Sequence, residues 1–302
     1  MRSDRTKTLE QGGLLLIDKP SGLTSHDIVF KARKALNNKK IGHTGTLDPL
    51  ASGLLVLCVG KATKLIKYLT ALTKTYQAQA VLGIGTDTDD IMGNTVATAD
   101  PLWISDSEIT NKLAGFVGKS QQLPPSYSAI KVKGKKLYEY ARQNLPLPEL
   151  SPREIEIYAI EGVTTQRDEQ KRLIFVNFSC KVSKGTYIRA LARDLGKILE
   201  TCGTLVALRR TKVGGLDVAD AISLIDLEQG SFAFQDPLKT LEMPSIILGH
   251  EHIKAVLNGT PLPKTLFSFP TETIIFDEQK QPIAIYRYDE EKDKMRMSVK
   301  LV

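Results

Sequence analysis

Two long runs of alternating residues constrain the fold of this chain more than any other feature of its sequence. Apolar and polar residues alternate over positions 155–159 and again over positions 174–182. A period of two is typical of strands that bury one face of a sheet. Residues 186–200 follow with apolar side chains at helical spacing, which predicts a helix packed on that sheet. The predicted apolar face of this helix comprises Ile188, Leu191, Ala192, Leu195, Ile198 and Leu199.

Shorter signals toward the N-terminus complete the prediction of an α+β fold. Residues 12–17 and 54–59 are apolar runs that predict buried strands, and residues 74–84 predict a further strand. A helix is expected to begin at Ser25 and to bury an apolar face. That face is predicted to comprise Ile28, Val29, Ala32 and Leu36. The strands and helices together favour a mixed sheet with flanking helices.

The chain of 302 residues is long enough for two domains. Near Pro244 the composition changes, and short strand-like runs follow, such as 273–276 and 283–288. We therefore predict one domain over residues 1–246 and a small β domain over residues 247–302. Residues 119–150 combine prolines, lysines and tyrosines, which indicates an exposed basic insertion in the first domain.

The net charge of +7 is distributed unevenly along the chain. The segments 1–50, 119–142 and 181–212 carry +4, +5 and +6, whereas residues 213–302 carry −5. Clustered lysines and arginines favour a polyanionic partner because they displace counterions from phosphates. Ordinary solvated faces would give the same counts, so the charge alone leaves the partner open.

Neither a membrane segment nor a targeting signal is expected from the sequence. The first eleven residues lack the apolar core of a signal peptide, and the longest apolar runs are far shorter than the ~20 residues that span a bilayer. Cys58 and Cys180 lie in apolar runs and are expected to be buried as free thiols. These features predict a protein of the reducing cytoplasm.

Metal sites are also not expected. His250 and His252 are close in sequence but have no further ligands nearby. The acidic run at residues 87–90 lacks the pattern of a calcium loop, because Met92 and Thr98 stand where that loop needs Gly and Glu. We predict an exposed turn there, capped by its own aspartates.

The strongest local motif is a glycine-rich loop around one carboxylate. Residues 42–53 read Gly-His-Thr-Gly-Thr-Leu-Asp-Pro-Leu-Ala-Ser-Gly and lead into a predicted buried strand. Pro49 biases Asp48 away from helical geometry, so Asp48 is expected to be held on a shaped loop. Phosphate cradling is disfavoured because no Lys-Ser or Lys-Thr pair follows the glycines.

This loop resembles the catalytic motif of the TruB family of pseudouridine synthases, which convert uridine 55 in the T-loop of tRNA. The resemblance covers roughly residues 12–215. Further segments agree with the family in their order along the chain: residues 18–27, 74–76, 124–131, 184–189 and 208–211.

The resemblance implies three catalytic positions and no cofactor or metal. Asp48 matches the essential aspartate, which attacks either carbon 6 of the uracil or the anomeric carbon of the sugar. Arg189 matches the arginine that pairs with this aspartate and orients it. Tyr76 matches the tyrosine that lies against the target base. Stacking is its safer role, since a phenol is a poor base at neutral pH.

The resemblance also implies residues that bind the RNA. Tyr187 and Leu208 match residues that line the uracil pocket, and His43 matches the histidine that family members insert into the RNA loop. Extruding a stacked base costs roughly a few kcal/mol, which an inserted ring offsets in part. Phosphate contacts are then expected from the basic side chains around the cleft: Lys131, Lys133, Lys135, Lys136, Arg209 and Arg210.

For the whole chain the resemblance implies a pseudouridine-synthase-like core followed by a small PUA-like β domain. The partner is tRNA, through its T-arm, and we expect a monomer. Because residues 213–302 are acidic overall, we expect little phosphate binding from the C-terminal domain. The alternatives are a guide-dependent enzyme of the dyskerin branch, a tRNA-folding chaperone that uses the same cleft, and a basic protein without an RNA partner.

Overall fold

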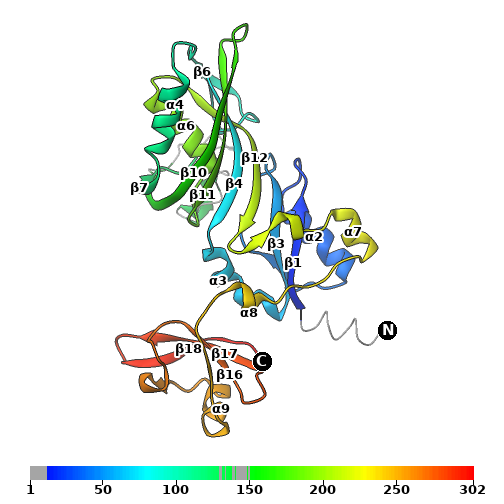
Figure 1. The fold of residues 1–302 in the computed structure, drawn as a ribbon. Coiled ribbons are helices and arrows are strands. Elements are labelled where there is room, and N and C mark those ends of the chain that lie inside the picture. Colours follow the sequence, from blue (N-terminus) through cyan, green and yellow to red (C-terminus); the bar gives the residue numbers. More distant parts are fainter. Residues whose placement is uncertain (1–11, 129–130, 133, 138–139, 141–147, 149) are drawn as a thin grey trace.

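A large mixed sheet forms the first part of the molecule (Figure 1). The computed structural model describes residues 12–128, 131–132, 134–137, 140, 148 and 150–302. The strand order is β1-β3-β12-β4-β11-β10-β7, with β2 paired to β3 and β13 to β12. The pairing is antiparallel except between β3 and β12, which run parallel and meet over only two residue pairs. The bounds are β1 (Gly12–Lys19), β2 (Ile41–His43), β3 (Ser52–Gly60), β4 (Lys74–Leu82), β7 (Gly118–Gln122), β10 (Arg153–Asp168), β11 (Leu173–Val182), β12 (Gly203–Val213) and β13 (Leu216–Asp217).

Helices cover one face of this sheet and enclose its main core. Helix α2 (Ser25–Leu36) packs on the β1–β3 half, and α6 (Ile188–Ile198) packs on the β4–β12 half. Thr24 caps α2 through a reciprocal capping box with Asp27, which explains why the helix begins at the predicted residue. The predicted buried face of α2 is confirmed. The remaining helices are α3 (Ile66–Ala71), α4 (Asp106–Ala114), α7 (Leu224–Gln229), α8 (Pro237–Thr240) and α9 (His250–Leu257), with short 3₁₀ turns over residues 61–65, 218–220 and 264–266.

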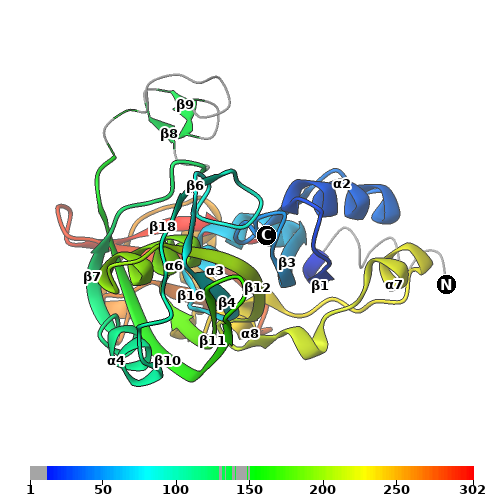
Figure 2. The same ribbon diagram turned by 90° about the horizontal axis from the view of Figure 1, so that it is seen from above.

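The structure confirms an α+β fold and corrects two details of the prediction. Ile198, expected on the buried face of α6, is 44% exposed because it lies at the margin of that face, whereas the next residue, Leu199, is buried. The predicted insertion also begins later than residue 119, since β7 pairs with β10 inside the main sheet. Beyond β7, β8 (Lys131–Val132) and β9 (Lys135–Lys136) form a separate two-stranded sheet, which lies apart from the main body in Figure 2.

The C-terminal part forms a second sheet against the outer side of α3. Its strand order is β14-β16-β17-β18-β15. Ser298 on β18 accepts hydrogen bonds from Lys67 Nζ and, at 2.9 Å, from the Tyr68 hydroxyl. Apolar side chains of both sheets share one core cluster around Tyr68. The bounds are β14 (Ser245–Ile247), β15 (Leu262–Pro263), β16 (Thr273–Phe276), β17 (Pro282–Asp289) and β18 (Lys294–Lys300).

Within the described part of the chain, no helix has the length and apolar character needed to span a bilayer. Cys58 and Cys180 are buried free thiols, as predicted. Both belong to strands that are covered by helices or by the C-terminal sheet, which explains their apolar surroundings.

Candidate active site

The loop between β2 and β3 carries Asp48 and is fixed by backbone contacts on both sides of that residue. We call residues 44–51 the catalytic loop. Ser25, at the start of α2, donates through its hydroxyl to Leu47 O at 3.0 Å and accepts from Leu47 N–H at 2.8 Å. Gly22 N–H donates to Pro49 O at 2.8 Å. Residues 22–25 therefore hold the catalytic loop, which gives a structural reason for the presence of both segments in the sequence.

The side chain of Arg210 holds the catalytic loop and the start of β3 through hydrogen bonds to backbone carbonyls. Its Nε donates to Leu54 O at 2.7 Å and its Nη2 to Gly45 O at 3.1 Å, and the side chain is 1% exposed. Its backbone also explains Gly53, where a Cβ would lie 2.3 Å from Arg210 O at a φ of +97°. This placement corrects the prediction that Arg210 contacts phosphate. The guanidinium is buried and its donors are directed to loop carbonyls.

Asp48 and Arg189 form the predicted pair. Arg189 Nε lies 2.8 Å from Asp48 Oδ2, and the two side chains are 5% and 37% exposed. The Nε–H makes no aligned hydrogen bond, so charge and contact rather than a directed bond hold the pair together. The Asp48 carboxylate is thus placed against Arg189, while part of it stays open to a substrate.

Arg189 is positioned by a second loop, which sequence reasoning treated as a simple turn. Its Nη1 donates to Thr88 O at 2.8 Å, its Nη2 donates to Tyr127 O at 3.0 Å, and Nη1 lies 3.6 Å from Asp90 Oδ2. Thr88 and Asp90 belong to residues 87–94, which we call the acidic loop. It connects the two strands of a small hairpin, β5 (Ile84–Thr86) and β6 (Thr95–Thr98).

Asp90 corrects the prediction of an exposed turn. It is buried, and its carboxylate accepts hydrogen bonds from Thr88 Oγ1 and Met92 N–H as well as facing Arg189. The available signal was the pattern Thr-x-Asp-x-x-Gly at residues 88–93, in which an aspartate closes its own turn. That signal gives local geometry but not the partner, because Arg189 is 99 residues away in sequence.

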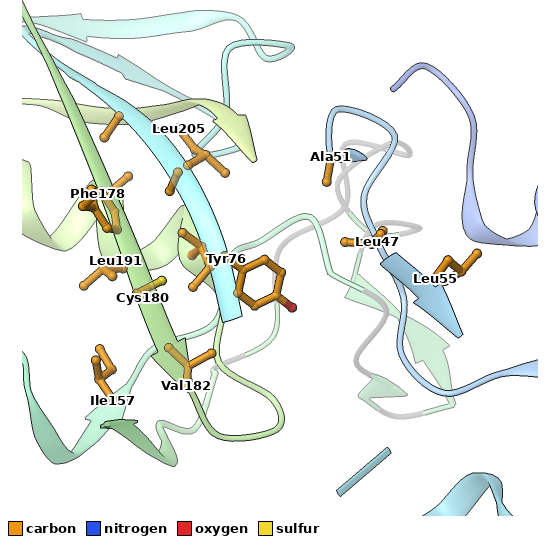
Figure 3. Close-up of a cluster of buried hydrophobic side chains, with 14 of the residues drawn as sticks. Leu47, Ala51, Leu55, Tyr76, Ile157, Phe178, Cys180, Val182, Leu191 and Leu205 are labelled. Carbon is orange, nitrogen blue, oxygen red and sulfur yellow. The ribbon is translucent and has the colours of Figure 1, made fainter. Parts of the chain in front are cut away.

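Tyr76 lies on the central strand β4 and faces the catalytic loop. It stands directly opposite Arg210 on β12, is 8% exposed, and packs in the same cluster as Leu47 and Ala51. Figure 3 shows its hydroxyl pointing away from the sheet core toward Leu47. A planar ring at the floor of the site, beside the Asp48 loop, provides a surface for a flat base.

Tyr187 forms the N-cap of α6, immediately before the buried start of that helix. The side chain of Gln122 on β7 makes two hydrogen bonds to the Tyr187 backbone. Its Oε1 accepts from Tyr187 N–H at 2.8 Å, and its Nε2 donates to Tyr187 O at 3.1 Å. Burial raises the pKa of the Tyr187 phenol, and the charges of Asp48 and Arg189 also act on this pKa, so all three groups are neighbours. The phenol therefore stays protonated at neutral pH and can donate a hydrogen bond.

Two further side chains lie at the base of the catalytic loop. His43, at the end of β2, accepts from Gly45 N–H at 3.3 Å through Nδ1, and burial lowers its pKa, so the ring is neutral at pH 7. Lys19 is fully buried, and its ammonium donates to Leu23 O at 2.7 Å. Burial lowers the Lys19 pKa to about 8, although the Asp48 charge opposes that shift. Sequence reasoning did not single out Lys19.

The predicted phosphate-contact residues are spread more widely than the cleft. Arg209 forms a two-point ion pair with Asp18, at 3.0 and 2.7 Å, on the sheet face opposite Tyr76. Lys131, Lys135 and Lys136 lie in the β8–β9 hairpin, of which only the backbone is described, and Lys133 lies outside the described residues.

A large hollow lies beside the site but is not its centre. Its volume is about 770 Å³, and Leu208 and Leu50 line it together with polar side chains of the uncovered sheet face, including Gln77, Gln79 and Asn177. Neither Asp48 nor Tyr76 lines it. Strand alternation explains this separation, because residues 77 and 79 point to the opposite face from Tyr76. The Asp48–Arg189 pair is therefore the candidate reactive centre, because it brings a partly exposed carboxylate and a buried guanidinium together at 2.8 Å.

No group of three potential metal-binding side chains gathers among the residues that the structure describes. The site comprises the Asp48–Arg189 pair, Tyr76 on β4, and Tyr187 at the N-cap of α6. Such a set of residues suits a reaction in which a carboxylate attacks, or stabilises charge on, a flat polar ring.

Comparison with known proteins identifies the class to which this site and fold belong. A family model described as "TruB family pseudouridylate synthase (N terminal domain)" matches residues 33–188, which include the Asp48 loop and Tyr76. The protein is thus an isomerase of the pseudouridylate synthase class. A second model, "tRNA pseudouridylate synthase B C-terminal domain", matches residues 189–253. The chain belongs to the TruB family.

Curated relatives and solved structures agree with that assignment. "tRNA pseudouridine synthase B" of Clostridium kluyveri is 40% identical over 87% of this chain and 88% of the relative. The protein of the same name from Listeria innocua is 40% identical over 96% and 98%. The chain in "Crystal Structure of a Cbf5-Nop10-Gar1 Complex" is 23% identical with a TM-score of 0.69, covering 98% of this chain and 86% of that one. This last likeness shows the shared fold.

Proposed function

We propose that this protein isomerises uridine 55 in the T-loop of tRNA to pseudouridine, with Asp48 as the nucleophile. The observation that carries the proposal is the 2.8 Å pair between Asp48 and the buried Arg189, beside the floor ring of Tyr76. The names of the relatives support tRNA as the substrate.

The chemistry requires one carbon–nitrogen bond to break and one carbon–carbon bond to form within the same nucleotide. Asp48 forms a covalent bond either to carbon 6 of the uracil or to the anomeric carbon of the ribose. The glycosidic bond to nitrogen 1 breaks, the base turns, and carbon 5 joins the sugar. Carbon 5 then loses its proton, nitrogen 1 takes up a proton, and the Asp48 carboxylate is released, so the reaction is a net isomerisation and no cofactor is consumed.

Arg189, Tyr76, Tyr187 and Leu208 are assigned the supporting roles. Arg189 holds the carboxylate beside the base, and Tyr76 supplies a flat surface for the base. Tyr187 and Leu208 border the uracil from the two flanking elements, α6 and β12. The burial of Arg189 strengthens its electrostatic contact with Asp48, because little water reaches the guanidinium.

The uridine must leave its stack before it can reach Asp48, so the protein must also hold the opened loop. We assign His43 to fill the space left by the base, because its neutral ring can stack without the cost of burying a charge. Lys131, Lys133 and Lys136 are assigned to the RNA backbone. Arg209 is paired with Asp18, so it can contact an RNA phosphate only after that ion pair breaks.

The proposal is tested by incubating the purified protein with an unmodified tRNA transcript and mapping pseudouridine by mass. We expect one modified position, uridine 55, also in a minihelix that contains only the T-arm, and a monomer by light scattering. Asp48→Asn is the matched control and should bind the transcript without modifying it. Binding without modification by the wild-type protein would instead support the chaperone alternative. Activity only with an added guide RNA would support the dyskerin-like alternative.

A further inference from the structure

The acidic loop places two exposed apolar side chains directly after Asp90. Ile91 is 43% exposed and Met92 is 74% exposed. Among the large apolar side chains that the structure describes, Met92 has the highest exposed fraction. We call these two residues the apolar tip.

The apolar tip is held rigidly, although it faces solvent. Asp90 accepts from Thr86 Oγ1 at 2.7 Å through its carbonyl and from Met92 N–H at 3.1 Å through its carboxylate. At the base of the loop, Asp87 accepts from Asn94 N–H at 2.8 Å. These bonds fix the backbone on both sides of the tip, so its exposure is a property of a defined turn.

The tip borders the reactive centre. Asp90, its neighbour in sequence, lies 3.6 Å from Arg189, which pairs with Asp48. Ile91 N–H donates to Leu205 O at 2.9 Å on β12, the strand that also carries Leu208. Ile91 and Met92 therefore directly follow Asp90, whose carboxylate lies beside Arg189 of the Asp48–Arg189 pair.

We propose that the apolar tip packs against RNA bases next to the extruded nucleotide. This inference rests on the proposed function. Extruding a base leaves the faces of neighbouring bases without their stacking partner, and apolar side chains such as Met and Ile cover such faces. Met92 is unbranched and adaptable, which suits a contact that forms only when the RNA loop opens.

Salt dependence separates this contact from those made by lysines. Phosphate contacts weaken with rising salt because they release counterions, whereas burial of an apolar side chain on a base does not. Loss of the tip is thus expected to weaken the RNA complex by the same factor at every salt concentration.

The experiment compares Met92→Ser and Met92→Leu with the wild-type protein on a tRNA transcript at two salt concentrations. Ile225→Ser is the control, because Ile225 is 66% exposed on α7, which lies far from α6 and β6 in Figures 1 and 2. We expect Met92→Ser to raise KM about tenfold, the size of a lost Met burial, and Met92→Leu to restore it. kcat, its pH profile and Tm should stay unchanged, and Ile225→Ser should match wild type.

Several results would overturn the inference. They are an unchanged KM in Met92→Ser, a loss that Met92→Leu does not restore, and a loss confined to low salt. A fall in kcat or a shifted pH profile would mean that the substitution acts through Asp90 and Arg189. If the wild-type protein modifies no tRNA, the proposed function fails instead, so the two failures are distinguishable.

Discussion

The catalytic loop and the acidic loop both present a carboxylate to Arg189, but the two loops are held in different ways. The catalytic loop is held by groups outside it, Ser25 and the buried guanidinium of Arg210, and its Asp48 side chain remains 37% exposed. The acidic loop is held partly by its own Asp87 and Asp90 side chains and partly by Leu205 on β12, and its Asp90 carboxylate is 10% exposed.

This difference assigns different roles to two residues of the same type. A carboxylate that reacts must be free of directed bonds on one side, so the restraint falls on the backbone around it. A carboxylate that orients an arginine can instead be buried and accept hydrogen bonds from its own loop. Asp48 fits the first description and Asp90 fits the second. The predictions below test this division of roles.

The largest effect is expected from Asp48→Asn. The amide has the same shape but cannot form the covalent bond, so pseudouridine formation should fall by at least about a thousandfold. Tritium release from labelled uridine measures this loss, and tRNA binding should remain near the wild-type level. Substantial turnover in Asp48→Asn would remove the nucleophile assignment.

Arg210→Met tests the external support of the catalytic loop. Removing the guanidinium leaves buried carbonyls of Leu54 and Gly45 without donors, which should lower the free energy of unfolding by about 3 kcal/mol. Arg209→Met is the matched control on the next residue. Its pair with Asp18 is more than a third exposed and should contribute about 0–1 kcal/mol. Urea unfolding measures the free energy of unfolding of both variants. An equal loss in Arg209→Met and Arg210→Met would contradict the assignment of Arg210 as the buried support of the catalytic loop.

Asp90→Asn should produce a smaller loss than Asp48→Asn. The amide oxygen can still accept from Thr88, but Arg189 loses the charge that helps to fix it, so kcat should fall about tenfold with little change in KM. Asp87→Asn lies in the same loop without a contact to Arg189 and should remain near wild type. A loss as complete as that of Asp48→Asn would mean that both carboxylates take part in the chemistry.

The smallest effect concerns Lys74, whose stem lies beside Gly45 beneath the catalytic loop. Burial lowers the pKa of Lys74 from 10.5 to about 8. Between pH 8 and 10.5 the unfolded chain binds more protons at this residue than the folded chain, so stability should rise with pH in that window. Relative to Lys74→Met, the wild-type free energy of unfolding should gain about 2 kcal/mol from pH 8 to pH 10. A flat difference in urea unfolding would exclude this buried charge.

Much of the fold could be predicted from the sequence because its signals are local. The alternating run at residues 174–182 became β11, and the capping pattern at Thr24 set the start of α2. The exposure of Ile198 could not be predicted, because it depends on how far around α6 the packing against the sheet extends. The same holds for β7, whose polar sequence enters the sheet only through its pairing with β10.

In the candidate site, too, some features follow from local sequence and others only from tertiary packing. The sequence by itself determined that Asp48 lies on a glycine-shaped loop, since Pro49 and the flanking glycines act on their own backbone. Only the tertiary structure decided that Asp90 orients Arg189, that Arg210 is buried, and that Arg209 faces the other side of the sheet. These outcomes depend on which distant segments meet and on strand alternation across β12. Local sequence can specify a turn or a strand, but a partner 99 residues away is chosen only when the sheet and helices pack.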